Sequence, residues 1–130
     1  MKFGVSPSPF VWWKSVDEFE NWISEAESCG YDSIFIADHY ELPAQFKADR
    51  PDSSAEFSEI FPSNDLLDAW TTLSYIAAKT RNIKIGTCVS PIPRWIPSQL
   101  AKVISIVDLL SNGRVIAGLG AGWFPGEFIN

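Results

Sequence analysis

The side chains best suited to chemistry are an adjacent aspartate and histidine, Asp38 and His39, which follow the apolar run 33–37. Histidine exchanges protons near neutral pH and therefore suits general acid–base catalysis. His39 is the only histidine in the chain. His39 is either an ordinary loop residue or an acid–base group. Its position at the carboxyl end of a predicted strand favours the role of acid–base group. No metal site is expected, because there is no second histidine and neither cysteine is close in sequence.

A second candidate region closes the apolar run that begins at Ile83. Its last residues are mostly small: Thr87, Cys88, Val89 and Ser90. Two prolines follow, Pro91 and Pro93, and we expect them to stop strand pairing because proline lacks the backbone N–H. Such an ending leaves space and exposed backbone at the carboxyl end of the strand, where ligands bind in α/β proteins. Cys88 is expected to be buried, as a structural thiol.

A third candidate region is the glycine run 118–122, which contains Gly120, Ala121 and Gly122. It does not have the spacing of a dinucleotide-binding fingerprint, because Trp123 occupies the sixth position and no helix is expected after it. The glycines indicate either close approach of backbone or ligand, or an ordinary turn. The sequence leaves both interpretations open.

Four strands and three helices must position these regions. Strands are expected at residues 2–6, 33–37, 83–89 and 115–119. The first helix begins after Ser15 and ends at Gly30, the second begins at Asp65 or Asp68, and the third runs from Pro97 to Gly113. Strand–helix units of about 30 residues predict right-handed crossovers and a parallel sheet. This is half of an eight-stranded barrel, so we expect residues 1–130 to be the first half of a domain of about 250 residues or more, or to be completed by a partner.

Apolar periodicity predicts the buried face of each helix. The predicted sets are Val16, Phe19, Trp22, Ile23 and Ala26; then Ala69, Trp70, Leu73, Ile76 and Ala77; then Leu100, Val103, Ile104, Val107 and Leu110. The acidic residues on the other face of the first helix are expected to form a solvated surface. The long irregular segment 40–64 is expected to act as a lid.

Composition narrows the class of protein. The chain has 130 residues and a net charge of −6, which argues against nucleic-acid binding because that requires a basic surface. No apolar run approaches the length of about 20 residues that a membrane span requires. The start of the chain lacks the apolar core of a signal peptide, so a cytoplasmic protein is expected. Cys29 and Cys88 fall at opposite ends of the predicted sheet, so we expect two free thiols.

Four ordered blocks resemble the bacterial luciferase-like superfamily of flavin and deazaflavin oxidoreductases. The blocks are GYDSIFIADH at 30–39, DAWTTLSYIAAKT at 68–80, IKIGTCVSP at 83–91, and LLSNGRVIAGLGAGW at 109–123 with Glu127 behind it. The resemblance implies an α/β fold, a (β/α)8 TIM barrel of which residues 1–130 are the N-terminal half. It also implies a flavin or deazaflavin ring across the carboxyl ends of the strands.

The resemblance assigns roles to the candidate residues. His39 matches the catalytic histidine that approaches the ring, and a non-proline cis peptide is implied at Cys88 and Val89, with Ser90 beside them. The implied ring-binding residues are Asp38, Thr87, Cys88, Val89, Ser90, Gly120, Ala121 and Gly122. Asp38 before His39 is more similar to the deazaflavin branch than to the luciferases, which favour glutamate there. Some deazaflavin alcohol and sugar-phosphate dehydrogenases carry an acid in the glycine turn; here Gly122 and Trp123 stand in its place, which disfavours those substrates.

The expected function is therefore hydride transfer to or from a small-molecule substrate, with the deazaflavin coenzyme F420 as cofactor. One alternative is an FMN-dependent monooxygenase, which would need a flavin reductase as partner. Another is a flavin-binding protein without turnover. The resemblance also implies a homodimer.

Overall fold

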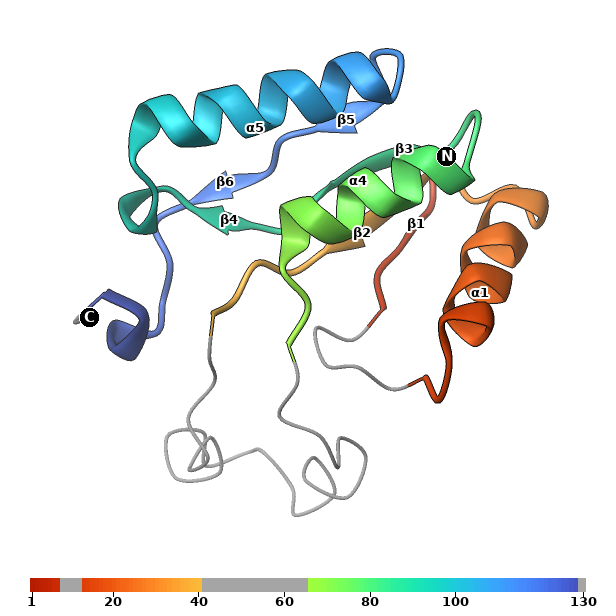
Figure 1. Ribbon diagram of the computed structural model, residues 1–130, viewed down its shortest axis with the longest axis horizontal. Helices are drawn as coiled ribbons and strands as arrows, with labels where there is room; N and C mark the ends of the chain where they lie inside the picture. Colours follow the sequence, from red (N-terminus) through yellow and green to blue (C-terminus); the bar gives the residue numbers. More distant parts are fainter. Residues whose placement is uncertain (8–12, 41–65, 129–130) are drawn as a thin grey trace.

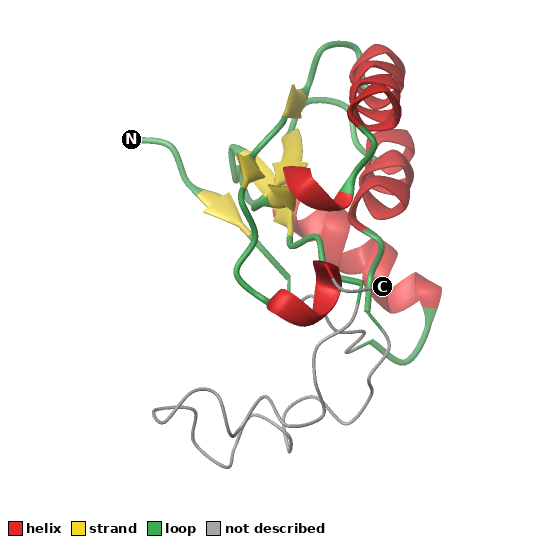
Figure 2. Cartoon of the chain, turned by 90° about the vertical axis from the view of Figure 1, so that its left-hand side faces the viewer, coloured by secondary structure: helices red, strands yellow, loops and turns green. Residues whose placement is uncertain are grey.

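The computed structural model describes residues 1–7, 13–40 and 66–128, and its frame is a parallel sheet (Figure 1). The strands lie in the order β1-β2-β3-β5, which are Gly4–Val5, Ser33–Ile36, Lys84–Thr87 and Val115–Ile116. Each adjacent pair is parallel. The helices are α1 (Val16–Ser28), α4 (Ala69–Lys79) and α5 (Pro97–Leu110), and Figure 2 shows them gathered to one side of the strands. The predicted parallel arrangement is confirmed.

Local signals set the ends of the helices. The Ser15 side chain accepts a hydrogen bond from the backbone N–H of Glu18 at 3.2 Å, and Asp68 accepts one from Thr71 at 2.8 Å. Both are N-caps, which satisfy backbone donors that have no partner within the helix. Gly30 and Gly113 follow α1 and α5 with φ of 83° and 75°, a left-handed conformation that glycine adopts without steric cost. The predicted helix boundaries at these four residues are confirmed.

The core lies between the sheet and the helices. All five residues predicted for the buried face of α4 are buried, together with Phe19, Ile23, Ala26, Leu100 and Val107. Two predicted core residues are instead exposed: Val16 at 58% and Leu110 at 70%. They are the first residue of α1 and the last of α5, so the helical period places them on the correct face but beyond the part of the helix that packs.

The prediction of a solvated acidic face on α1 is wrong for Glu27. The Glu27 carboxylate accepts hydrogen bonds from the backbone N–H groups of Arg81, Asn82 and Ile83, at 2.6 to 3.2 Å. Glu20 pairs with the Lys79 ammonium at 2.7 Å. These contacts tie α1 to the segment that enters β3 and to the last turn of α4.

The prolines do not stop strand pairing as expected. After β3 the chain forms β4 (Ser90–Pro91), which pairs in parallel with β6 (Leu119–Gly120). Ser90 donates its N–H to the Gly118 carbonyl at 2.8 Å, so the pair does not need a donor from Pro91. The expected fourth strand is accordingly split into β5 and β6. The peptide bond between Cys88 and Val89 is cis, as the family resemblance implied.

Within the described parts of the chain, no helix combines the length and the apolar character that crossing a membrane requires.

Candidate functional site

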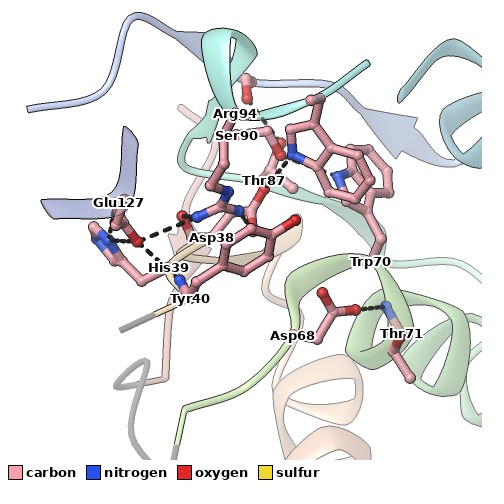
Figure 3. Close-up of polar contacts among 12 residues, drawn as sticks. Asp38, His39, Tyr40, Asp68, Trp70, Thr71, Thr87, Ser90, Arg94 and Glu127 are labelled. Carbon is pink, nitrogen blue, oxygen red and sulfur yellow. Dashed lines mark hydrogen bonds and ion pairs between the residues drawn. The ribbon is translucent and has the colours of Figure 1, made fainter. Parts of the chain in front are cut away.

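A buried charge cluster lies at the carboxyl end of the sheet, where β2 ends (Figure 3). Arg94, in the short 3₁₀ helix η1 (Ile92–Arg94), pairs through Nη2 with the Asp38 carboxylate and donates through Nη1 to the Asp38 carbonyl at 3.1 Å. Nη1 also lies 3.2 Å from Oε1 of Glu127, in the 3₁₀ helix η2 (Pro125–Phe128). These three side chains are at most 2% exposed. One buried cation therefore joins three segments that are distant in sequence.

His39 and Tyr40 attach to the same cluster. Nδ1 of His39 lies 3.1 and 3.2 Å from the two oxygens of Glu127, and the backbone N–H of Tyr40 donates to Oε1 at 2.8 Å. The Tyr40 ring lies 3.7 Å from the Arg94 guanidinium carbon, a cation–π contact. Trp123 meets the imidazole edge to face, with 6.0 Å between ring centroids. The imidazole orientation is therefore fixed by a carboxylate on one side and an aromatic ring on another.

Three of the predicted ring-binding residues have buried side chains with protein partners. The hydroxyl of Thr87 donates to the Gly118 carbonyl at 2.8 Å, and the hydroxyl of Ser90 accepts from Nε1 of Trp70 at 3.0 Å. Asp38 is engaged in the same way, because Nε1 of Trp95 donates to its second oxygen at 3.3 Å. These side chains hold the strand ends in place.

Cys88 is exposed, so the prediction of a buried structural thiol is wrong. Val89 is 42% exposed, while Thr87 and Ser90 on either side of the pair are buried. The Thr87 and Ser90 hydroxyls are bound to other elements, whereas the side chains of Cys88 and Val89 lie on the outer side. The cis peptide between them thus lies at the surface of the site.

Cys88 and Val89 line a small cavity of about 110 Å³ next to His39. Its other lining residues are Pro91, Gly122, Trp123 and Glu127. The structure thereby brings together the predicted residues from the ends of β2 and β3 and from the glycine run. A Cβ atom on Gly120 would lie 2.6 Å from a methyl group of Val89, so this glycine is required by close packing of the protein itself. Ala121 is exposed beside it.

A larger hollow, of about 630 Å³, lies at the opposite, amino ends of the strands. Two of its charged side chains bind backbone groups: Asp32 accepts from Phe3 at 2.7 Å, and the Lys84 ammonium donates to the Gly113 carbonyl at 2.9 Å. In α/β barrels this end serves stability, whereas the carboxyl end carries the chemistry. The cavity beside His39 is therefore the candidate site.

Sequence reasoning gave no role to Arg94, Tyr40 or Trp95, and it named Glu127 without a partner. Arg94 lies 56 residues after Asp38, and Glu127 lies 88 residues after His39. The available signal was position, since Arg94 and Glu127 both follow strands of the parallel sheet. Loops of this kind meet at its carboxyl edge.

The comparisons with known proteins identify the family and the fold. A family model described as luciferase-like monooxygenase matches residues 2–130. An uncharacterised protein of Mycobacterium tuberculosis is 31% identical over 105 residues, which are 81% of this chain and 37% of that protein. An F420-dependent glucose-6-phosphate dehydrogenase of Amycolatopsis mediterranei is 33% identical over 98 residues, which are 75% of this chain and 25% of the dehydrogenase.

Among solved structures, a monooxygenase from Streptomyces bottropensis superposes with a TM-score of 0.70 at 26% identity, over 98% of this chain and 35% of that one. The chain spans between 25% and 37% of the length of these relatives. The fold is accordingly part of the luciferase-like TIM barrel, and the relatives include both an F420-dependent enzyme and a monooxygenase. Its match over nearly every residue shows that this chain belongs to the luciferase-like monooxygenase family of flavin- and deazaflavin-dependent oxidoreductases.

Proposed function

We propose that the protein transfers hydride between a small-molecule substrate and the deazaflavin coenzyme F420, with His39 as its acid–base group. The observation that carries the proposal is the pairing of His39 with Glu127 in a cavity that also exposes Cys88 and Val89. This geometry supports the proposal because an imidazole, which can exchange protons near neutral pH, lies beside an exposed strand end. The F420-dependent relative and the aspartate before His39 favour the deazaflavin.

The residues at the cavity fit a flat ring. Cys88 and Val89 form an exposed backing, and Pro91, Gly122 and Trp123 border it. A cavity of about 110 Å³ is smaller than the roughly 300–1,000 Å³ of a complete small-molecule site. We therefore assign these residues to one wall of the ring site. Asp38, Thr87 and Ser90 would support that wall through the buried contacts of their side chains.

The bound coenzyme supplies hydride chemistry, and the protein supplies position and proton transfer. When a carbon of the substrate loses hydride, the neighbouring atom loses a proton, and a double bond forms between the two atoms. His39 would take that proton at Nε2, the ring nitrogen that faces away from Glu127, and would return it in the reverse direction. The wall formed by Cys88 and Val89 would exclude water from one side of the reacting atoms.

Coenzyme titrations and turnover assays on the full-length protein test this proposal. We expect F420 to bind at least tenfold more tightly than FMN, about 1.4 kcal/mol in binding free energy. His39→Ala should lower turnover by about 10²-fold or more, with little change in coenzyme affinity. Unchanged turnover in this variant would return His39 to the role of an ordinary loop residue.

The second candidate function is an FMN-dependent monooxygenase supplied by a flavin reductase. The structural similarity to a monooxygenase favours it. Tenfold tighter binding of FMN, with oxygen consumption that depends on substrate, would replace the deazaflavin assignment. Tight flavin binding without turnover of any substrate class would instead indicate a non-catalytic flavin-binding protein.

A further inference from the structure

We propose that Glu127 is a positioning residue that holds His39 in the tautomer protonated at Nδ1. This leaves Nε2 as the nitrogen that exchanges the proton. The catalytic consequence rests on the function proposed above, whereas the tautomer itself is a property of this chain alone.

The donors around Glu127 carry the argument. Oε1 accepts from the Tyr40 backbone N–H at 2.8 Å and lies 3.2 Å from Nη1 of Arg94. Both of these groups only donate hydrogen bonds, so the carboxylate acts here as an acceptor. Nδ1 of His39, at 3.1 and 3.2 Å from the two carboxylate oxygens, then completes the set as a third donor. A neutral imidazole that donates at Nδ1 carries its lone pair at Nε2.

The surroundings make this arrangement rigid. The Glu127 side chain is 1% exposed and the Arg94 side chain 2%, so water does not compete strongly for their contacts. Arg94 is itself fixed by Asp38 at the end of β2. No hydrogen bond joins Nε2 to any other residue in the described part of the chain. The two ring nitrogens therefore have different tasks: Nδ1 anchors the ring, and Nε2 is available to a reactant.

Charge supports the same role. Arg94 is shared by two carboxylates, Asp38 and Glu127, so the cluster has a formal charge of −1 while His39 is neutral. When His39 takes up a proton at Nε2, the imidazolium faces a carboxylate that already accepts from Nδ1. Glu127 thus accepts the hydrogen bond from Nδ1 in both states of the ring.

The direct test is nitrogen NMR of the full-length protein with histidine ring labelling, at about pH 9, where imidazole is neutral. The His39 resonances are identified by their loss in His39→Ala. We expect the Nδ1–H tautomer to dominate in the wild type. In Glu127→Gln the amide oxygen still accepts from Tyr40 and Arg94, so its NH₂ group faces Nδ1 and the dominant tautomer should switch to Nε2–H. The wild-type measurement does not depend on the folding of any variant.

Kinetics separates positioning from a general structural role. Glu127→Gln should lower kcat by about 10-fold to 10²-fold with KM changed less than about threefold, because the substrate still binds but meets the wrong nitrogen. In a His39→Ala background the same substitution should have no further effect on kcat, since Glu127 acts through His39. Glu18→Gln is the matched control, because the Glu18 carboxylate also accepts a backbone N–H, at 2.7 Å, but lies outside the site.

The outcomes are distinct. A dominant Nε2–H tautomer in the wild type, or an unchanged tautomer in Glu127→Gln, overturns the proposed role of Glu127. A loss of kcat of equal size in the His39→Ala background also overturns it, because the effect then does not pass through the imidazole. A tautomer switch without any loss of turnover supports the role of Glu127 and overturns the catalytic role of His39.

Discussion

Removal of the Glu27 carboxylate should destabilise the protein without touching the candidate site. Glu27 lies in the last turn of α1 and accepts three backbone N–H groups from the segment that leads into β3. These donors lie at the amino end of the sheet. In Glu27→Ala the three N–H groups lose their acceptor together.

The size of the effect follows from the exposure of the three donors. A hydrogen bond to a charged group contributes about 1.5–3 kcal/mol when the donor is otherwise left unpaired. Arg81 and Asn82 are exposed, so water can replace the carboxylate there, whereas Ile83 is 3% exposed. Most of the cost therefore comes from the lost hydrogen bond at the Ile83 N–H, and the other two N–H groups add little. The expected decrease in the free energy of unfolding is about 2–3 kcal/mol. Glu25→Ala is the control, because Glu25 is exposed on the same helix; its effect should stay within about 0.5 kcal/mol.

The pH dependence gives an independent check. Burial raises the pKa of Glu27, but hydrogen bonds from Asn82, Ile83 and Arg81 outweigh burial, and the net pKa lies below its ordinary value. A carboxyl whose folded-state pKa is lowered stabilises the protein above its unfolded-state pKa, about 4.3, and this contribution is lost as pH falls through the folded-state pKa.

Urea denaturation of wild type, Glu27→Ala and Glu25→Ala, followed by circular dichroism between about pH 3 and pH 8, measures both effects. The difference between wild type and Glu27→Ala should be constant near neutral pH and should narrow below about pH 4.5. A variant as stable as wild type at pH 7, or a difference that widens in acid, would refute the reasoning. Coenzyme affinity should be the same in all three proteins.

Two further predictions concern the ends of the sheet. Arg114→Met should lower the free energy of unfolding by about 3 kcal/mol or more in urea denaturation, because it leaves several buried carbonyls without a donor. A typical substitution costs about 1 kcal/mol, so a smaller loss than that in Arg114→Met would contradict this prediction. Ser90→Trp should abolish folding as judged by circular dichroism, since Ser90 is fully buried against Trp70, whereas Cys88→Trp should keep the fold and weaken coenzyme binding at least tenfold. A folded Ser90→Trp variant would contradict the packing argument for Ser90, and normal binding in Cys88→Trp would count against the assigned ring wall.

The sequence predicted those features that depend on local pattern. The caps at Ser15 and Asp68, the glycines after α1 and α5, and the spacing of the strands are each readable from residues near in sequence. The contact between His39 and Glu127 is different, because 88 residues separate them. Apolar residues that repeat every 3.6 residues in a helix, or every 2 in a strand, indicate which face of the element is buried. They do not indicate which loop side chains meet at the edge of the sheet.

Cys88 shows the same limit at closer range. Its neighbours are apolar or small, so a strand pattern predicts burial. In the structure Thr87 and Ser90 on either side are buried and bind Gly118 and Trp70, while Cys88 between them is exposed. Those partners come from other elements. Exposure at the end of β3 was therefore decided by packing between elements, which a single strand does not encode.

Two arginines divide the tasks of stability and chemistry between the ends of the sheet. Arg114 at the amino end donates to carbonyls and a hydroxyl, and burial lowers its pKa while the Glu27 charge opposes that shift. All of these contacts of Arg114 are structural hydrogen bonds. Arg94 at the carboxyl end binds two carboxylates, and its Nε is buried without a partner among the described residues. Because Glu127 also binds His39, one buried arginine adds rigidity at the amino end of the sheet, and the other holds the carboxylate that orients the histidine proposed above as the acid–base group.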